Sequence, residues 1–97
     1  MLSLNATPME KGTVLIVGSG GREHAISLQL AKSASVADIH VAPGNAGTSM
    51  VGSNHEVALE DIDGLCELAV RIGADLVIIG PEAPLVAGLA DRLRQQG

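Results

Sequence analysis

The chain has 97 residues, and its 11 acidic and 6 basic side chains give a formal net charge of -5 at pH 7. Hydrophobic residues make up 46% of the chain, yet there is no Phe, Tyr or Trp, so valine, isoleucine, leucine and alanine must build the core. Without aromatic rings there is no platform for stacking bases, which contributes roughly 1–3 kcal/mol per base, and the acidic charge repels a phosphate backbone. These features exclude nucleic acid as a partner.

The length suits a single domain, which we expect to follow a short extension. Residues 1–12 contain neither a long apolar run nor a basic cluster, so they resemble no targeting peptide, and we expect them to be an unstructured extension of a domain over residues 13–97. No apolar stretch reaches the roughly 18 residues that a membrane span needs, so no membrane partner is expected. The lone Cys66 cannot form an internal disulfide, which together with the lack of a signal peptide favours a cytoplasmic location.

The first half of the domain alternates strand and helix patterns. Thr13–Val17 is a β-branched, almost continuously apolar run that ends at Gly18, which is typical of a strand covered on both faces. A helix is predicted from Arg22 to about Ser33, and Asp38–Ala42 is predicted as a second short strand. The helix should bury a broad apolar stripe made of Ala25, Ile26, Leu28 and Leu30.

The second half repeats this alternation. After the second strand we expect a loop with a short edge strand at Glu56–Leu59. A helix is predicted from Asp61, a good N-cap residue, to Gly73, a good C-cap residue, and Asp75–Ile79 predicts another buried strand. Pro84 suits the first turn of a last helix. The inner faces of these two helices are predicted to be Leu65, Leu68, Ala69 and Ile72, and Val86, Leu89, Ala90 and Leu93.

The alternation predicts an α/β fold with three layers, in which a Rossmann-like parallel sheet of four or five strands carries helices on both faces. In such a sheet the carboxyl ends of the strands lie at one edge, so loops far apart in sequence can line a single crevice. Three loops directly follow predicted strands, namely Gly18–His24, Ala42–Gly47 and Gly80–Leu85. We therefore expect a binding site at that edge.

The first loop has the chemistry of a phosphate site. Gly18, Gly20 and Gly21 permit a tight turn and a close approach of backbone amides to a ligand, the next helix presents its positive end, and Arg22 adds a cationic contact. A glycine-rich turn without any ligand explains the same residues. A dinucleotide site is less favoured, because Glu23 stands where the third fingerprint glycine would fall and no acidic residue ends the second strand. A P-loop is excluded, since no Gly-Lys-Ser/Thr follows the turn.

Asn45 and Glu82 are the polar candidates of the other two loops. Asn45 can offer its amide to a ligand or serve only as a turn residue. Glu82 lies between two prolines, and its carboxylate could accept hydrogen bonds from sugar hydroxyls or an amine; a solvated carboxylate at a helix start is the alternative. His24 suits packing better than catalysis. His40 and His55 have no partner at metal-ligand spacing, so neither a metal site nor a catalytic residue is assigned.

Taken together, the three loops resemble a known family. Val14–Ala25, Val41–Thr48 and Gly80–Leu85 are similar, in order and spacing, to the amino-terminal domain of phosphoribosylamine-glycine ligase, also called glycinamide ribonucleotide synthetase. The resemblance runs over residues 13–97 and implies a pre-ATP-grasp domain of an enzyme that joins glycine to 5-phosphoribosylamine in de novo purine biosynthesis. It also implies that the glycine turn and Glu82 hold the phosphoribosyl substrate. The predicted substrate-binding residues are Gly20, Gly21, Arg22, Asn45 and Glu82.

The resemblance also implies what the chain lacks. Enzymes of this family are several times longer, and the ATP-grasp portion that binds ATP, magnesium and glycine has no counterpart in these residues. We therefore expect no cofactor in this chain, ATP and magnesium in the full-length enzyme, and no ligase activity from the chain alone. The expected partners are phosphoribosylamine or its glycinamide product and the remainder of the ligase chain. Two alternatives stay open: a stand-alone nucleotide- or NAD-binding Rossmann-like module, and the corresponding domain of another ATP-grasp ligase.

Overall fold

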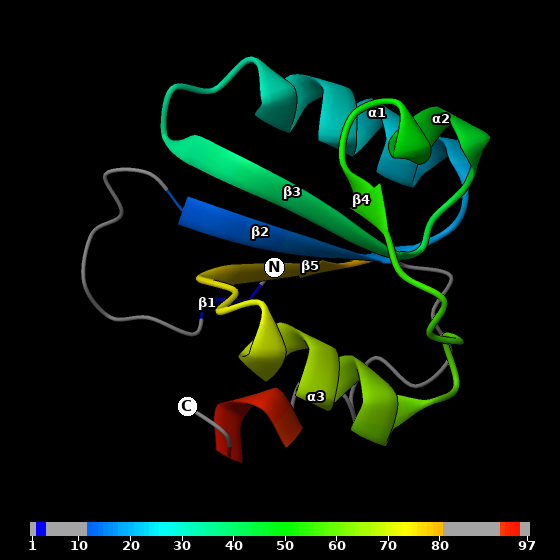
Figure 1. Ribbon diagram of the computed structural model, residues 1–97, viewed down its shortest axis with the longest axis vertical. Helices are drawn as coiled ribbons and strands as arrows, with labels where there is room; N and C mark the ends of the chain where they lie inside the picture. The colour runs from blue at the N-terminus through cyan, green and yellow to red at the C-terminus, as the bar shows by residue number, and fades with distance from the viewer. Residues whose placement is uncertain (1, 4–11, 81–91, 96–97) are drawn as a thin grey trace.

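The computed structural model describes residues 2–3, 12–80 and 92–95 of the chain. They form a five-stranded sheet in the order β1-β5-β2-β3-β4, with helices on both faces (Figure 1). Residues 92–95 are helical. In chain order, the other elements are β1 (Leu2–Ser3), β2 (Gly12–Gly18), α1 (Gly21–Ala31), β3 (Val36–Pro43), α2 (Ala46–Ser49), β4 (Ser53–Asn54), α3 (Ile62–Arg71) and β5 (Leu76–Ile79).

Four of the strands are parallel, which confirms the predicted Rossmann-like α/β arrangement. Strand β2 lies between β3 and β5, and β4 extends the sheet beyond β3. In the register, Val17 of β2 pairs with both Ala42 of β3 and Ile79 of β5. Because these three strands end at the same edge, the loops that follow them begin close together.

The fifth strand comes from the amino-terminal segment. Leu2 and Ser3 form β1, which pairs antiparallel with β5. We expected residues 1–12 to be an unstructured extension, and for Leu2 and Ser3 the structure differs because their backbone extends the sheet. Residues 1 and 4–11 lie outside the described residues.

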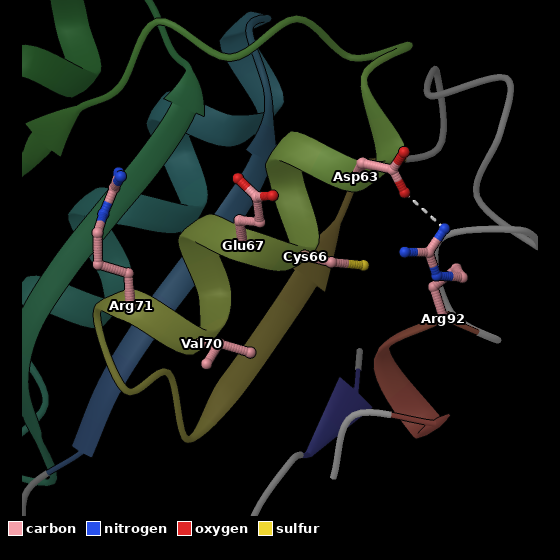
Figure 2. A pocket seen from close by; sticks show the side chains of 6 residues that line it. All are labelled: Asp63, Cys66, Glu67, Val70, Arg71 and Arg92. Carbon is pink, nitrogen blue, oxygen red and sulfur yellow. Dashed lines mark ion pairs between the residues drawn. The ribbon is translucent and has the colours of Figure 1, made fainter.

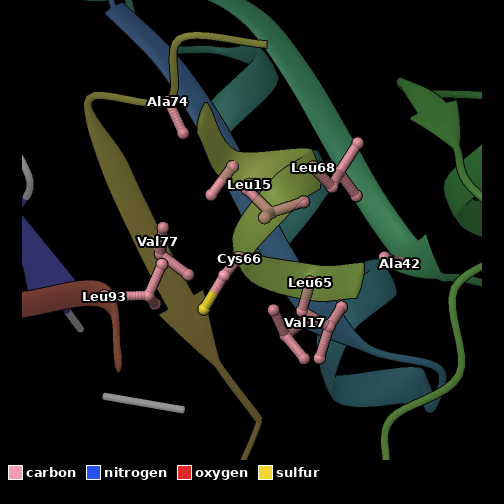
Figure 3. Packing of buried hydrophobic residues seen from close by; sticks show 10 residues of the cluster. Leu15, Val17, Ala42, Leu65, Cys66, Leu68, Ala74, Val77 and Leu93 are labelled. Carbon is pink, nitrogen blue, oxygen red and sulfur yellow. The ribbon is translucent and has the colours of Figure 1, made fainter. Parts of the chain in front are cut away.

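Each face of the sheet has its own apolar core. Successive side chains of β2 alternate between the faces, so Val14 and Ile16 pack with Ile26 and Leu30 of α1 on one side. On the other side, the β2 residues Leu15 and Val17 pack with Ala42, Val77, Leu65, Leu68 and Leu93 (Figure 3). Burial on both sides explains why β2 is apolar at consecutive positions.

Helix α1 buries a narrower face than we predicted. Ile26 and Leu30 pack against the sheet, but Ala25 is exposed and Leu28 is 45% exposed. The residues that α1 buries completely are Glu23 and Ser27. At 3.6 residues per turn, positions 23, 26, 27 and 30 share one side of a helix, whereas 25 and 28 turn away from it. Polar side chains therefore take part of the face that we assigned to apolar ones.

The predicted edge strand at Glu56–Leu59 is wrong. These residues form no strand, and the edge strand is β4, at Ser53–Asn54, preceded by the short helix α2. Val57 and Leu59 contact the core from a loop. Their alternation with Glu56 resembles a strand pattern, but it reflects two apolar contacts made by an irregular segment.

Helix α3 matches its prediction. The Asp61 side chain accepts a hydrogen bond from the Gly64 amide at 2.9 Å, as an N-cap residue does. Gly73 follows the helix with φ of +67°, a conformation that favours glycine. The start of the predicted last helix at Pro84 lies outside the described residues, together with Val86, Leu89 and Ala90, whereas Leu93 is buried as expected.

Candidate functional site

The glycine turn between β2 and α1 is built around a buried carboxylate. Glu23 is fully buried, and its Oε1 accepts a hydrogen bond from the Gly20 amide at 2.8 Å. Gly18 has φ of +152°, and a Cβ there would lie 2.5 Å from Cγ of Glu23. The side chain of Glu23 thus folds beneath the turn, at the position where a dinucleotide fingerprint would have its third glycine.

Our sequence interpretation missed this role of Glu23. Gly20 is the N-cap of α1 and Glu23 is its third residue, which is the spacing at which a Glu side chain reaches back to the N-cap amide. That spacing was the available signal. The Gly20 amide is thus already hydrogen-bonded within the turn. The amides of α1 that suit a ligand are therefore those of Gly21 and Arg22.

The start of α1 is open. Gly21 and Arg22 are exposed, and among the described residues a Cβ on Gly21 would meet no atom within 4 Å beyond its chain neighbours and the backbone of its own helix. The first amides of a helix have no acceptor within the helix, and they lie at the positive end of its dipole. Gly21 and Arg22 therefore present unshielded amides and one guanidinium side chain to solvent, a combination suited to an anion such as a phosphate.

Asn45 connects the second loop to the glycine turn. Its Nδ2 donates to the carbonyl oxygens of Ser19, at 2.8 Å, and of Gly20, at 3.0 Å. The backbone adds a further link, because the Gly44 amide donates to the Gly18 carbonyl at 3.0 Å. The side-chain amide that we predicted to contact a ligand thus holds the turn, and direct contact between Asn45 and substrate stays a prediction.

His24 and Gly80 show how closely the three loops approach. A Cβ on Gly47 would lie 2.5 Å from Nδ1 of His24, so the imidazole packs directly against the backbone of the second loop. This contact agrees with a packing role for His24. Gly80 is buried and its amide donates to the Val17 carbonyl at 2.8 Å, which places the beginning of the third loop at the same edge. Glu82 lies outside the described residues.

A histidine pair that the sequence did not predict lies beside β3 and β4. Nδ1 of His40 and Nε2 of His55 are 2.9 Å apart, so one nitrogen donates and the other accepts. Burial, followed by the charges of His40 and Arg71, lowers the pKa of His55. The pairing depends on the β3–β4 register, in which His40 lies opposite Ser53, and that register was hidden by the misplaced edge strand. Among the described residues, no group of three or more His, Cys, Asp or Glu could hold a metal ion.

A hollow of about 430 Å³ is lined by no residue of the glycine turn or of the Ala42–Gly47 loop. One side is formed by α3, and Arg92 forms an ion pair with Asp63 across it at 2.6 Å (Figure 2). Burial raises the pKa of the Cys66 thiol at this hollow, which disfavours the reactive thiolate. Its lining residues are Asp63, Cys66, Glu67, Val70, Arg71 and Arg92. None of them belongs to the predicted site, so we keep the site at the loops.

Comparisons with known proteins identify the family of the chain. The family described as "Phosphoribosylglycinamide synthetase, N domain" matches residues 12–97. The chain is 49% identical over 84 residues to phosphoribosylamine–glycine ligase of Mycobacterium tuberculosis (strain ATCC 25618 / H37Rv), which covers 87% of this chain and 20% of that protein. It is 51% identical over 89 residues to the protein of the same name from Caulobacter vibrioides, covering 92% of this chain and 21% of that protein.

The chain spans about a fifth of the length of the curated relatives that it matches. In the described part of the chain, no helix is both long and apolar enough to cross a membrane.

Proposed function

Because the chain belongs to the phosphoribosylglycinamide synthetase N-domain family, we propose that it is the substrate-holding amino-terminal domain of a ligase that joins glycine to 5-phosphoribosylamine in purine biosynthesis. The relatives that it matches carry the name phosphoribosylamine–glycine ligase. The lone Cys66 of this chain cannot form an internal disulfide, which supports a cytoplasmic location for the enzyme. The partners of the domain are then the phosphoribosyl substrate or its glycinamide product and the remaining ligase chain.

The observation that carries the proposal is the open start of α1. In our proposal the substrate phosphate lies against the amides of Gly21 and Arg22, and the Arg22 guanidinium contributes a charge-assisted contact. Asn45 holds the carbonyls of Ser19 and Gly20 in place. Glu82 accepts hydrogen bonds from the ribose or the amine of the substrate. Glycine at position 21 supports this arrangement, because no side chain of the described residues occupies the space beside its Cα, which can therefore admit a ligand.

The domain would contribute to the reaction by orientation. In the proposed ligase, ATP converts glycine into an acyl phosphate, and the amine of phosphoribosylamine attacks its carbonyl carbon as the phosphate leaves. Fixing the phosphate at one end of the substrate restricts where the amine at the other end can reach, and such orientation can lower a barrier by several kcal/mol. In our proposal, ATP and magnesium bind to the rest of the ligase.

The test is a pair of valine variants in the full-length ligase that carries this domain. Gly21→Val places a branched side chain in the space proposed for the phosphate, and its Cβ meets no other part of the described structure within 4 Å beyond the chain beside it in α1. Ala25→Val is the matched control, because Ala25 is an exposed residue of the same helix and the substitution adds the same β-branching. We expect Gly21→Val to weaken binding of glycinamide ribonucleotide at least about tenfold in calorimetry, and Ala25→Val to leave it unchanged.

Equal affinity in the two variants would place the phosphate elsewhere. Titration of the unsubstituted protein with NAD addresses the dinucleotide alternative. Binding of NAD without binding of glycinamide ribonucleotide would reject the ligase assignment in favour of a nucleotide-binding module.

A further inference from the structure

A polar network extends from β4 to the glycine turn. Its centre is Thr48, which is fully buried although its side chain is polar. The Thr48 hydroxyl oxygen lies 2.8 Å from Oδ1 of Asn54 and accepts a hydrogen bond from the Asn45 amide at 2.8 Å. Nδ2 of Asn54 donates to the Asn45 carbonyl at 2.8 Å. The single hydroxyl proton of Thr48 lies within reach of two acceptors, Oδ1 of Asn54 at 2.8 Å and the Asn45 carbonyl at 3.0 Å. Because the carbonyl also accepts from the Ser49 amide and from Asn54, we assign the proton to the shorter contact with Oδ1 of Asn54.

These contacts restrict Asn45 to one orientation. Its backbone amide and carbonyl bind Thr48 and Asn54, and its Oδ1 accepts from the Thr48 amide at 2.9 Å. Only Nδ2 then points toward the glycine turn, where it donates to Ser19 and Gly20. The network also fits tightly against Gly44, because a Cβ there would lie 2.7 Å from Oγ1 of Thr48.

The orientation of Asn45 determines the direction of one amide at the anion site. A trans peptide is planar, so its carbonyl and its N–H point in opposite directions. Asn45 holds the carbonyl of Gly20, and that same peptide carries the N–H of Gly21. The preceding peptide is held on both sides, by Asn45 at the Ser19 carbonyl and by Glu23 at the Gly20 amide. Fixing the Gly20 carbonyl therefore aims the Gly21 N–H away from Asn45, toward the open space at the start of α1.

We propose that Thr48 and Asn54 are positioning residues for the anion site, which act on the Gly21 amide through Asn45. The inference rests on the proposed function, because it assumes that the ligand phosphate lies at Gly21. It also gives β4 a role: the pairing of Asn54 with Val41 of β3 fixes the far end of the network to the sheet. A strand of two residues is sufficient for this, since only one side chain has to be held in place.

The experiment compares Thr48→Val with Thr48→Ser in the full-length ligase. Valine has the shape of threonine but lacks the hydroxyl, which leaves the Asn45 amide and Oδ1 of Asn54 without this partner, whereas serine retains it. We expect Thr48→Val to weaken glycinamide ribonucleotide binding and to raise the KM for phosphoribosylamine about tenfold. The KM values for glycine and ATP should stay unchanged, and Thr48→Ser should restore affinity to within about twofold of the unsubstituted enzyme.

Asn54→Ala is the second variant and guards against a Thr48→Val protein that does not fold. Asn54 is exposed, so its truncation spares the core while removing both contacts with Asn45 and Thr48. It should weaken product binding in the same selective way. Unchanged product affinity in folded Asn54→Ala would overturn the inference, as would a KM for glycine that rises in parallel with that for phosphoribosylamine.

Different outcomes would reject the proposed function and the positioning role of Thr48 and Asn54. If Gly21→Val loses product binding but Thr48→Val and Asn54→Ala keep it, the proposed function stands and the positioning role is wrong. If the unsubstituted ligase does not bind glycinamide ribonucleotide, the proposed function fails and the positioning role fails with it.

Discussion

Glu23 is an acidic side chain with no exposure to solvent, in a loop that we expected to bind an anion. Burying a carboxylate is costly unless hydrogen bonds compensate, and the Gly20 amide provides one such bond. The space that the side chain occupies exists only because residue 18 is glycine. Glu23 and Gly18 are therefore paired requirements of the turn, and replacing either would disturb the amides that follow.

The histidine pair makes stability depend on pH. The pKa of His55 is lowered from its ordinary value of 6.5, so the folded chain binds a proton there less readily than the unfolded chain does. The stability that comes from the neutral ring is complete above pH 6.5 and is lost as the pH falls through the lowered pKa of the folded state.

We expect His55→Gln to remove this part of the pH dependence. Urea unfolding measured from about pH 8 to about pH 5 should show a steeper loss of stability in the unsubstituted protein than in the variant. The charge of Arg71, on α3, contributes to the low pKa of His55. Arg71→Gln should therefore raise this pKa toward its ordinary value and make the loss of stability at low pH smaller. Parallel pH profiles for the unsubstituted protein and His55→Gln would contradict the assignment to this pair.

At the scale of the elements, the stability of α3 depends more on its N-cap residue, Asp61, than on the ion pair between Asp63 and Arg92. Asp61→Ala removes the acceptor of the Gly64 amide, and we expect a loss of about 1 kcal/mol in the free energy of unfolding. Asp61→Asn is the control, since asparagine also caps helices well. Asp63→Asn, which removes the pair with Arg92, should cost less than Asp61→Ala, because both partners of that pair are largely exposed, at 73% and 43%. Thermal or urea unfolding of the three variants measures the order, and an equal loss in Asp61→Ala and Asp61→Asn would contradict the capping role.

The elements that the sequence predicted well are those with a strong apolar pattern. Strand β2 is almost entirely buried, and β5 and α3 contribute apolar side chains to the cores, so their composition reveals them. Strand β4 could not be found in this way, because Ser53 and Asn54 are polar and exposed and pair only through their backbone. Because the sequence did not predict β4, it also did not predict the His40–His55 contact or the role of Asn54, since both follow from the register of that strand.

At the scale of the whole molecule, the parallel topology brought the loops together as predicted. Gly20, Gly21, Arg22 and Asn45 lie at the carboxyl edge of the sheet, because strand order alone determines which loops meet there. The finer geometry could not be predicted: whether the amide of Asn45 points to a ligand or to the Gly20 carbonyl depends on side-chain contacts that no sequence spacing specifies. The family resemblance added the substrate, which the residues alone left open between a phosphate and a dinucleotide.

If this domain binds the phosphoribosyl substrate and the rest of the ligase activates glycine, the 97-residue chain by itself should have no ligase activity. It spans about a fifth of its relatives, and we propose that the parts that activate glycine lie in the rest of the ligase. We expect purified chain to release no ADP from ATP in the presence of glycine and phosphoribosylamine, as followed in a coupled assay with full-length ligase as the positive control. Glycine-dependent ADP release that copurifies with the chain and persists after removal of contaminating ligase would contradict this division.

The outermost strands of the sheet have a consequence for self-association. Strands β1 and β4 are each two residues long, and they flank longer strands on either side. An exposed sheet edge is a template on which another chain can add a strand, and the risk of aggregation grows with the length of that edge. Leu2–Ser3 pairs with Leu76 and Val77 of β5, and Ser53–Asn54 does the same for His40 and Val41 of β3. In the described part of the chain the sheet therefore ends in strands of two residues, which offer few backbone groups to a second molecule and so disfavour growth into fibrils.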